Sequence, residues 1–230
     1  MSVRQKAPED LTAKKALALE VIDRLKKEYP DAGCTLDYAH AWQLLVSVRL
    51  AAQCTDARVN IVVEDLFAKY PSVAALAAAE PEDIEAIVKP CGLGHSKARD
   101  ISACMRMLRD KYDCQVPATF EELLALPGVG RKSANLIMGD VFGKPAIVTD
   151  THCIRLCNRI GLVDGIKEPQ KVEMALWKII PPEEGSDLCH RFVMHGRAVC
   201  NARKPECEHC CLKAICRYAQ EQSSTQTAGS

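Results

Sequence analysis

Apolar residues recur at helical spacing along most of the chain, and this pattern constrains the fold more than any other feature of the sequence. One apolar stripe comprises Leu17, Ala18, Val21, Ile22 and Leu25, and another comprises Val59, Val62, Val63, Leu66 and Phe67. No stretch of alternating apolar and polar residues competes with this spacing. The pattern predicts further helices over residues 40–52, 72–79, 81–88, 96–112, 119–125, 131–142, 151–160, 169–180 and 187–198. We therefore expect an all-α protein of about ten helices, joined by short links that carry Gly or Pro.

Charge is unevenly distributed along a chain whose formal net charge is zero. Because 30 Lys and Arg balance 30 Asp and Glu, the overall charge gives no argument for a nucleic-acid partner. Residues 64–85 carry a net charge of −5, however, whereas residues 126–159 carry +3 and residues 190–217 carry +4. We expect the two basic segments to share one face, as binding to a phosphate backbone requires. Ordinary solvated charge is the alternative interpretation.

The two ends of the chain and its cysteines indicate the compartment. The first ten residues, MSVRQKAPED, lack the apolar core and cleavage site of a secretory signal, and no later stretch approaches about 18 uninterrupted apolar residues. We therefore expect a cytosolic protein, with a polar, disordered tail over residues 219–230. In a reducing cytosol, clustered members of the 13 cysteines indicate metal or redox chemistry rather than disulfides.

Residues 126–135, LPGVGRKSAN, lie between two helical patterns and predict a helix-turn-helix hairpin. Its glycines permit a turn with positive φ, and the amides of Gly128, Val129 and Gly130 stand beside a new helix N-terminus. Unpaired amides and the helix dipole attract a phosphate there, whatever the base sequence. A plain turn between helices is the alternative interpretation.

Lys132 falls in the first turn of the helix that follows this hairpin, where the helix dipole disfavours a positive charge. Partial burial and the helix N-terminus would both favour the neutral amine, which is the form that a nucleophilic lysine needs. Taken alone, the residue is better interpreted as a lysine that only binds phosphate.

Asp150 precedes another predicted helix and is an apt N-cap, so we expect its carboxylate to be ionised. The helix over 131–142 is about 18 Å long. Residues 143–149 stretch to about 23 Å, which is enough to bring Asp150 back near Lys132. Capping alone is the alternative role. His152 stays outside the catalytic set, because a histidine in a first helical turn usually packs or forms hydrogen bonds.

Four cysteines near the end of the chain form the most specific signal in the sequence. Cys200, Cys207, Cys210 and Cys216 follow the spacing Cys-x6-Cys-x2-Cys-x5-Cys, which brings four soft thiolates into one short loop. Structural zinc sites are commonly built from two close pairs, and this loop has one, so a 4Fe-4S cluster fits better. Cys211 could compete as a ligand. We interpret the remaining eight as small apolar residues: Cys34, Cys54, Cys91, Cys104, Cys114, Cys153, Cys157 and Cys189.

Taken together, LPGVGRKSAN, TDTH and the cysteine loop, in this order and spacing, resemble the endonuclease III family of bifunctional DNA glycosylases and AP lyases. The similarity runs from about residue 15 to residue 217, and it includes LAAQCTD, GLGHSKA and HGRAVCNARKPEC. The resemblance implies a helix-hairpin-helix glycosylase fold. Residues 34–144 would form a six-helix domain, residues 1–33 and 145–218 would form an iron–sulfur cluster domain, and DNA would bind between them.

The resemblance also implies roles for individual residues. Lys132 would be the nucleophile and Asp150 the essential carboxylate. Gln53 would fill the space left by an extruded nucleotide and Leu93 would wedge into the opposite strand, since a base inside a duplex must be flipped out before it can react. Without the resemblance, Gln53 would be interpreted as helix surface and Leu93 as core. Arg203 and Lys204 would contact phosphates beside the cluster. Alternatively, the cluster could serve only to cross-link this part of the chain.

The implied function is base-excision repair of double-stranded DNA by a monomer, in the bacterial or archaeal cytosol and associated with the nucleoid. The enzyme would remove damaged, by family expectation oxidised, pyrimidines and cut the strand 3′ to the abasic site by β-elimination. Arg49, Gly94 and His95 depart from the residues that relatives carry, and they leave the lesion range open. Two alternatives remain: a monofunctional adenine-mismatch glycosylase, whose relatives lack a lysine at position 132, and a non-catalytic DNA-binding module.

Overall fold

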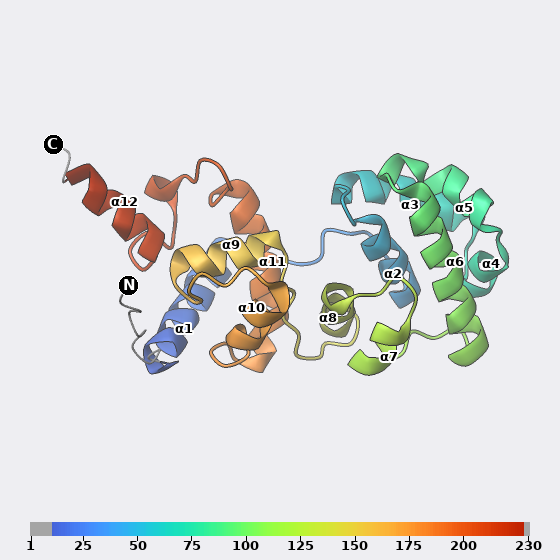
Figure 1. Cartoon of the computed structure of the whole chain (residues 1–230), viewed down its shortest axis with the longest axis horizontal. Helices are drawn as coiled ribbons and strands as arrows, with labels where there is room; N and C mark the ends of the chain where they lie inside the picture. The colour runs from blue at the N-terminus through green and yellow to red at the C-terminus, as the bar shows by residue number, and fades with distance from the viewer. Residues whose placement is uncertain (1–10, 228–230) are drawn as a thin grey trace, which may run out of the picture. The chain divides into compact units, whose positions relative to one another are not determined.

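A computed structural model describes residues 11–227, and within that range the chain forms twelve α-helices, three short 3-10 helices and no strand (Figure 1). The all-α prediction is confirmed. No helix in the described range is long and apolar enough to cross a membrane. The expectation that the first ten residues carry no secretory signal lies outside the described residues.

The contacts between Cα atoms divide the chain into two compact units, one formed by residues 34–144 and the other by residues 1–33 and 145–230. The second unit is therefore built from both ends of the chain. Lys132 belongs to the first unit and Asp150 to the second.

Seven α-helices make up the unit of residues 34–144. They are α2 (Ala41–Leu50), α3 (Asp56–Lys69), α4 (Val73–Ala78), α5 (Pro81–Val88), α6 (Gly94–Lys111), α7 (Phe120–Ala125) and α8 (Arg131–Asp140), with the 3-10 helix η1 (Lys89–Cys91) before α6. This is one helix more than the six implied by the resemblance, and α4 and α7 have only six residues each. The long helix α6 packs against α4 and α5 (Figure 1). Its Ile101, Met105 and Leu108 enter a core shared with the apolar faces of α2 and α3.

Five α-helices make up the other unit: α1 (Leu11–Glu28), α9 (Thr151–Ile160), α10 (Pro169–Leu176), α11 (Gly185–Ala198) and α12 (Arg217–Thr227). The 3-10 helices η2 (Pro182–Glu184) and η3 (Cys207–His209) lie in its connections. Helix α11 packs against α9 and α1, and Phe192 and Leu156 are fully buried. Gly196 permits this approach, because a Cβ there would lie 2.5 Å from Nδ1 of His152.

The polar tail differs from its prediction. Residues 217–227 form helix α12, so the predicted disorder from residue 219 is wrong as far as Thr227, while residues 228–230 lie outside the described range. Tyr218 lies beneath the Arg159 guanidinium at 4.9 Å, and Ala219 is buried. These contacts hold the first turn of α12, and they depend on tertiary neighbours that the composition of the tail does not reveal.

Candidate functional site

The glycine hairpin joins α7 to α8 through a tight turn. The Val129 amide donates to the Leu126 carbonyl at 3.1 Å, which closes the turn over Pro127 and Gly128. Gly128 has φ = +75°, where a side chain is disfavoured, whereas Gly130 is the N-cap of α8 with φ = −96°. The predicted positive φ therefore occurs at Gly128 and not at Gly130.

The hairpin presents free hydrogen-bond donors. The amides of Gly128 and Gly130 donate no hydrogen bond within the described part of the chain, and both residues are exposed. Helix α8 also begins without a side-chain hydrogen bond at its N-cap, Gly130. Unpaired amides at the positive end of a helix dipole form a binding site for an anionic group such as a phosphate.

Lys132 is the second residue of α8 and is exposed to solvent. The prediction of partial burial is therefore wrong for the free protein. The neighbouring Arg131 stacks over the Phe120 ring at 4.9 Å, across the hairpin on α7.

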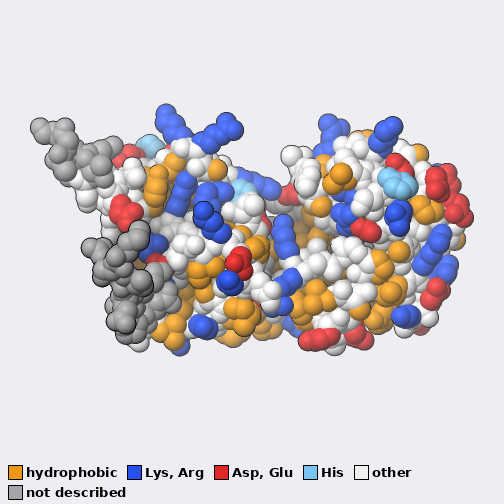
Figure 2. Space-filling view, viewed as in Figure 1, with side chains coloured by type: hydrophobic (Ala, Val, Ile, Leu, Met, Phe, Trp, Pro, Cys, Tyr) orange, Lys and Arg blue, Asp and Glu red, His pale blue; other side chains and the backbone are white. Residues whose placement is uncertain are grey.

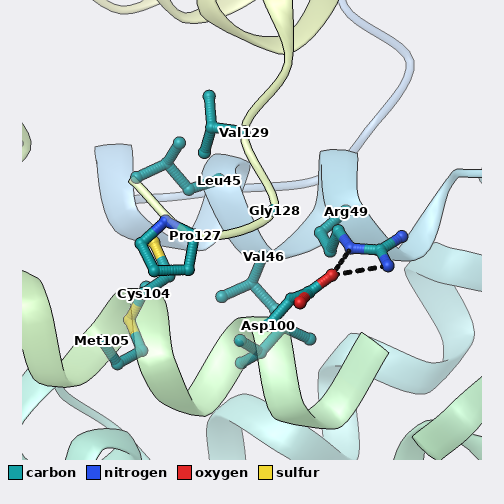
Figure 3. Close-up of a pocket in the computed structure, with 10 residues that line it drawn as sticks. Leu45, Val46, Arg49, Asp100, Cys104, Met105, Pro127, Gly128 and Val129 are labelled. Carbon is teal, nitrogen blue, oxygen red and sulfur yellow. Dashed lines mark hydrogen bonds and ion pairs between the residues drawn. The ribbon is translucent and has the colours of Figure 1, made fainter. Parts of the chain in front are cut away.

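An ion pair lies directly beneath the hairpin (Figure 3). Arg49 of α2 contacts Oδ2 of Asp100 of α6 through Nε at 2.7 Å and Nη2 at 2.6 Å, and it also donates to the Ser96 hydroxyl at 3.1 Å. A Cβ on Gly128 would lie 2.9 Å from Cβ of Asp100 and 3.1 Å from Cδ of Arg49. The hairpin backbone thus rests on the ion pair, and Arg49, a departure from the family pattern, has a defined partner.

Gln53 and Leu93 are both exposed and both have a strained backbone. Gln53 lies in the turn after α2 with φ = 57°, and Leu93 is the residue before α6 with φ = 50° and an exposure of 57%. Non-glycine residues rarely adopt this left-handed region, and such strain is concentrated at functional positions. The interpretations based on pattern alone, helix surface for Gln53 and core for Leu93, are wrong.

The two residues after Leu93 also have specific contacts. A Cβ on Gly94 would lie 3.2 Å from Cα of Lys89, so the absence of a side chain lets α6 begin close against η1. The His95 Nδ1 atom lies 3.0 Å from a carboxylate oxygen of Glu85 on α5. The dipeptide that departs from the family pattern is therefore attached to the acidic helix α5, over which Figure 2 shows Asp and Glu side chains gathered.

Asp150 begins helix α9 in the unit built from both chain ends. Its Oδ1 atom accepts the Cys153 amide at 2.7 Å, which confirms the predicted N-cap. The segment before it is anchored, because Ile147 is buried and the Val148 amide donates to the Cys189 sulfur at 3.2 Å. His152 lies 3.1 Å from the Arg155 guanidinium through Nδ1. The carboxylate of Asp150 is therefore held on a rigid element and remains half-buried.

All four predicted cysteine ligands line one small cavity. Arg159 and Tyr218 also line this cavity, whereas Cys211 does not. Cys211 lines a neighbouring groove together with Cys210 and Arg24. Among the described residues, no three His, Cys, Asp or Glu side chains converge on the position of a single metal ion. Thiols that surround a cavity rather than one point suit a cluster in which each cysteine binds its own iron, and they suit a single tetrahedral zinc less well.

Hydrogen bonds already reach two of these sulfur atoms. Arg159 donates to Sγ of Cys200 at 3.3 Å, and Nε2 of His195 lies 3.3 Å from Sγ of Cys210. Donors at such positions orient thiolate ligands and compensate their charge. On the other side of the His195 ring, Nδ1 lies 3.0 Å from the Tyr29 hydroxyl.

Three of the predicted cysteine ligands have a raised pKa in the free chain. A hydrogen bond with the Cys211 thiol, together with burial, raises the pKa of Cys210 to about 12, and burial raises the pKa of Cys207 and of Cys216. Binding of a metal centre would therefore have to displace these protons.

Arg203 and Lys204 are exposed on the turn that follows Cys200. The Lys204 amide donates to the Asn201 side chain at 2.9 Å, and Arg159 donates to the Asn201 and Ala202 carbonyls at 2.8 and 2.9 Å. Figure 2 shows Lys and Arg side chains projecting from this unit. The turn is a fixed basic projection beside the cysteine cavity.

Comparison with known proteins defines the class. Residues 46–182, more than half of the chain, match the family model described as HhH-GPD superfamily base excision DNA repair protein. The chain has the helix-hairpin-helix glycosylase fold of that superfamily. It is 44% identical over 211 residues to endonuclease III of Synechocystis sp., covering 91% of this chain and 96% of that protein.

The match with endonuclease III of Escherichia coli (strain K12) is 37% identical over 207 residues, covering 90% of this chain and 98% of that protein. A solved structure described as a trapped endonuclease III–DNA covalent intermediate has a TM-score of 0.85 and 41% identity, over 91% of this chain and 98% of that chain. The chain belongs to the endonuclease III family. It is a base-excision repair DNA glycosylase and AP lyase. Neither a monofunctional adenine-mismatch glycosylase nor a non-catalytic DNA-binding module is favoured. A 4Fe-4S cluster is characteristic of the family.

Replacing Gly128 by alanine should destabilise the first unit, because the new Cβ meets the Arg49–Asp100 pair and the backbone is left-handed. We expect a loss of about 1 to 3 kcal/mol in the free energy of unfolding, measured by thermal or urea denaturation. Gly130→Ala is the matched control, since nothing lies within 4 Å of its Cβ position and its φ is negative. Equal stability of the two variants would contradict the packing of the hairpin on the ion pair.

Proposed function

We propose that the chain removes oxidised pyrimidines from double-stranded DNA and cuts the strand 3′ to the resulting abasic site, acting as a monomer in the cytoplasm. The observation that carries the mechanism is the exposed amine of Lys132 in the first turn of α8, directly after a hairpin with unpaired amides. The likeness to an endonuclease III trapped as a covalent intermediate on DNA supports a mechanism with a covalent step, for which the Lys132 amine is the proposed nucleophile.

Lys132 attacks C1′ of the damaged nucleotide. A bond forms between Nζ and C1′, and the glycosidic bond breaks so that the base leaves with its electron pair. Loss of the amine protons and opening of the sugar ring give a Schiff base. Removal of a 2′ proton then expels the 3′ phosphate by β-elimination, and hydrolysis of the Schiff base returns the lysine.

Asp150 assists this reaction as an ionised carboxylate. It takes a proton from the attacking amine and stabilises the positive charge that develops on the sugar. Its hydrogen bond to the Cys153 amide fixes one carboxylate oxygen at the start of α9 and leaves the other oxygen for this work.

DNA is bound through its backbone and opened by inserted side chains. The amides of Gly128 and Gly130 and the cations of Arg203 and Lys204 contact phosphates, which gives affinity without sequence preference. The Val129 amide, predicted from the sequence to join them, already donates to the Leu126 carbonyl within the turn. Gln53 fills the space of the extruded nucleotide and Leu93 enters the opposite strand. Their exposure and left-handed backbones support these roles.

A 4Fe-4S cluster would be held by Cys200, Cys207, Cys210 and Cys216, the residues that line one cavity. When bound, the cluster supplies a cross-link among four thiolates. Arg159 and His195 orient two of these thiolates, and the same Arg159 fixes the turn that carries Arg203 and Lys204. The role that the geometry supports is to shape a phosphate-binding surface.

Lys132→Ala should abolish both strand cleavage and the covalent adduct formed with abasic-site DNA in the presence of borohydride. Gel electrophoresis of the trapped complex measures the adduct. Lys111→Ala, which alters an exposed lysine of α6, should trap as well as the wild type. An active wild-type enzyme that gives no adduct would overturn the Schiff-base mechanism.

Asp150→Asn separates capping from catalysis, because asparagine is also a good N-cap. We expect unchanged thermal stability and a release of damaged base slowed by about 10²- to 10⁴-fold. Thymine glycol in a duplex serves as the substrate. Base release at the wild-type rate would rule out a catalytic role for the carboxylate.

Purified protein should contain iron and inorganic sulfide, each at about four per chain. Cys210→Ser should lose most of both, whereas Cys211→Ser should retain them, because Cys211 lines a different groove. Metal and sulfide analysis with the visible absorption spectrum provides the measurement. Stoichiometric zinc without iron, or equal loss from both variants, would contradict the ligand assignment.

A further inference from the structure

Lys97 is a fully buried lysine in the first turn of α6. Its Nζ atom donates to the Leu50 carbonyl at 2.7 Å and to the Cys91 carbonyl at 2.8 Å. No carboxylate pairs with it among the described residues. A lysine is seldom buried without an anionic partner, so these two neutral acceptors need an explanation.

Both acceptors stand at the ends of helices. Leu50 is the last residue of α2, and Cys91 is the last residue of the 3-10 helix η1. Carbonyls at helix ends lack partners within the helix and attract cations. The single amine of Lys97 therefore ties together two chain segments that lie about 40 residues apart in the sequence.

Each of these segments leads at once to one of the two strained residues. Gln53 lies three residues after Leu50, and Leu93 lies two residues after Cys91. Both side chains are exposed, and both residues have positive φ. A strained conformation persists only where its surroundings fix it, and the amine of Lys97 is the anchor that the two turns share.

We propose that Lys97 is a positioning residue that sets Gln53 and Leu93 together, so that their insertion into DNA is one coupled event. The proposal rests on the insertion roles given above for these two side chains. Lys97 itself never touches DNA, because it is fully buried. Loss of its amine releases both turns, whereas loss of either inserted side chain removes one contact only.

The test monitors insertion directly. The wild type is bound to a duplex that carries a stable abasic analogue opposite 2-aminopurine, whose fluorescence rises when the base is unstacked. Lys97→Met removes the donors but keeps the length of the side chain, and it should abolish most of the rise. Lys111→Met is the matched control, with the same substitution at an exposed lysine of the same helix, and it should behave as the wild type.

A substrate that needs no side-chain insertion shows whether Lys97→Met impairs the positioning of Gln53 and Leu93 or the protein structure as a whole. Lys97→Met should slow cleavage of an abasic site in a duplex by about 100-fold, as expected when reacting groups are misplaced. Cleavage of an abasic site in a single-stranded oligonucleotide should change by less than about twofold, because a single strand has no stacked partner to displace. Equal losses on both substrates would overturn the proposal and leave Lys97 with a structural role.

A double-mutant cycle checks the coupling. If Lys97 acts through the two turns, Lys97→Met should add little to a variant that already carries Gln53→Ala and Leu93→Ala. Full additivity would overturn the inference. If Lys97→Met does not fold, Lys97→Gln takes its place, because glutamine keeps two N–H donors. This variant should retain part of the fluorescence rise. Complete loss of the rise in folded Lys97→Gln would count against the proposed role of Lys97.

Failure of this inference is distinguishable from failure of the proposed insertion roles. If Gln53→Ala and Leu93→Ala abolish the fluorescence rise and Lys97→Met does not, the roles of the inserted residues stand and the inference about Lys97 fails. If Gln53→Ala and Leu93→Ala leave the rise unchanged, the insertion roles themselves are wrong, and the inference fails with them.

Discussion

The contacts between the C-terminal turn of α2 and the first turns of α6 fix every candidate DNA-contacting element of the first unit. Two consecutive residues of α2 form these contacts. The Arg49 side chain forms an ion pair with Asp100, and the Leu50 carbonyl accepts a hydrogen bond from the Lys97 amine. The ion pair supports the hairpin backbone at Gly128, and the buried amine supports the turns of Gln53 and Leu93. Hairpin and insertion turns thus share one scaffold, so a shift in these contacts would displace all of them.

Helix α9 has the corresponding role in the other unit. It carries Asp150 at its start and Arg159 near its end, and its ten residues span about 15 Å. Arg159 donates to the Cys200 sulfur and to the carbonyls of the basic turn, and Tyr218 stacks beneath it. One short helix therefore carries the proposed catalytic carboxylate at its start and contacts the cysteine cavity near its end.

The sequence predicts elements where local chemistry marks their ends. The helices over 81–88 and 151–160 have the predicted bounds, because Pro81 and Asp150 start them. The helix predicted over 169–180 ends at Leu176, since the chain turns ahead of Pro181. Features set by distant neighbours were not predictable: the Asp100 partner of Arg49, the buried amine of Lys97, and the absence of Cys211 from the lining of the cysteine cavity.

Peptide mapping of the borohydride-trapped wild-type adduct tests the central claim, that Lys132 is the nucleophile, most directly. After nuclease and trypsin digestion, we expect a sugar remnant on Lys132 that blocks cleavage after that residue. Because trypsin does not cleave between Lys144 and Pro145, residues 132–155 should be recovered as one modified peptide. A remnant on any other amine, with unmodified Lys132 and normal cleavage after it, would contradict the account.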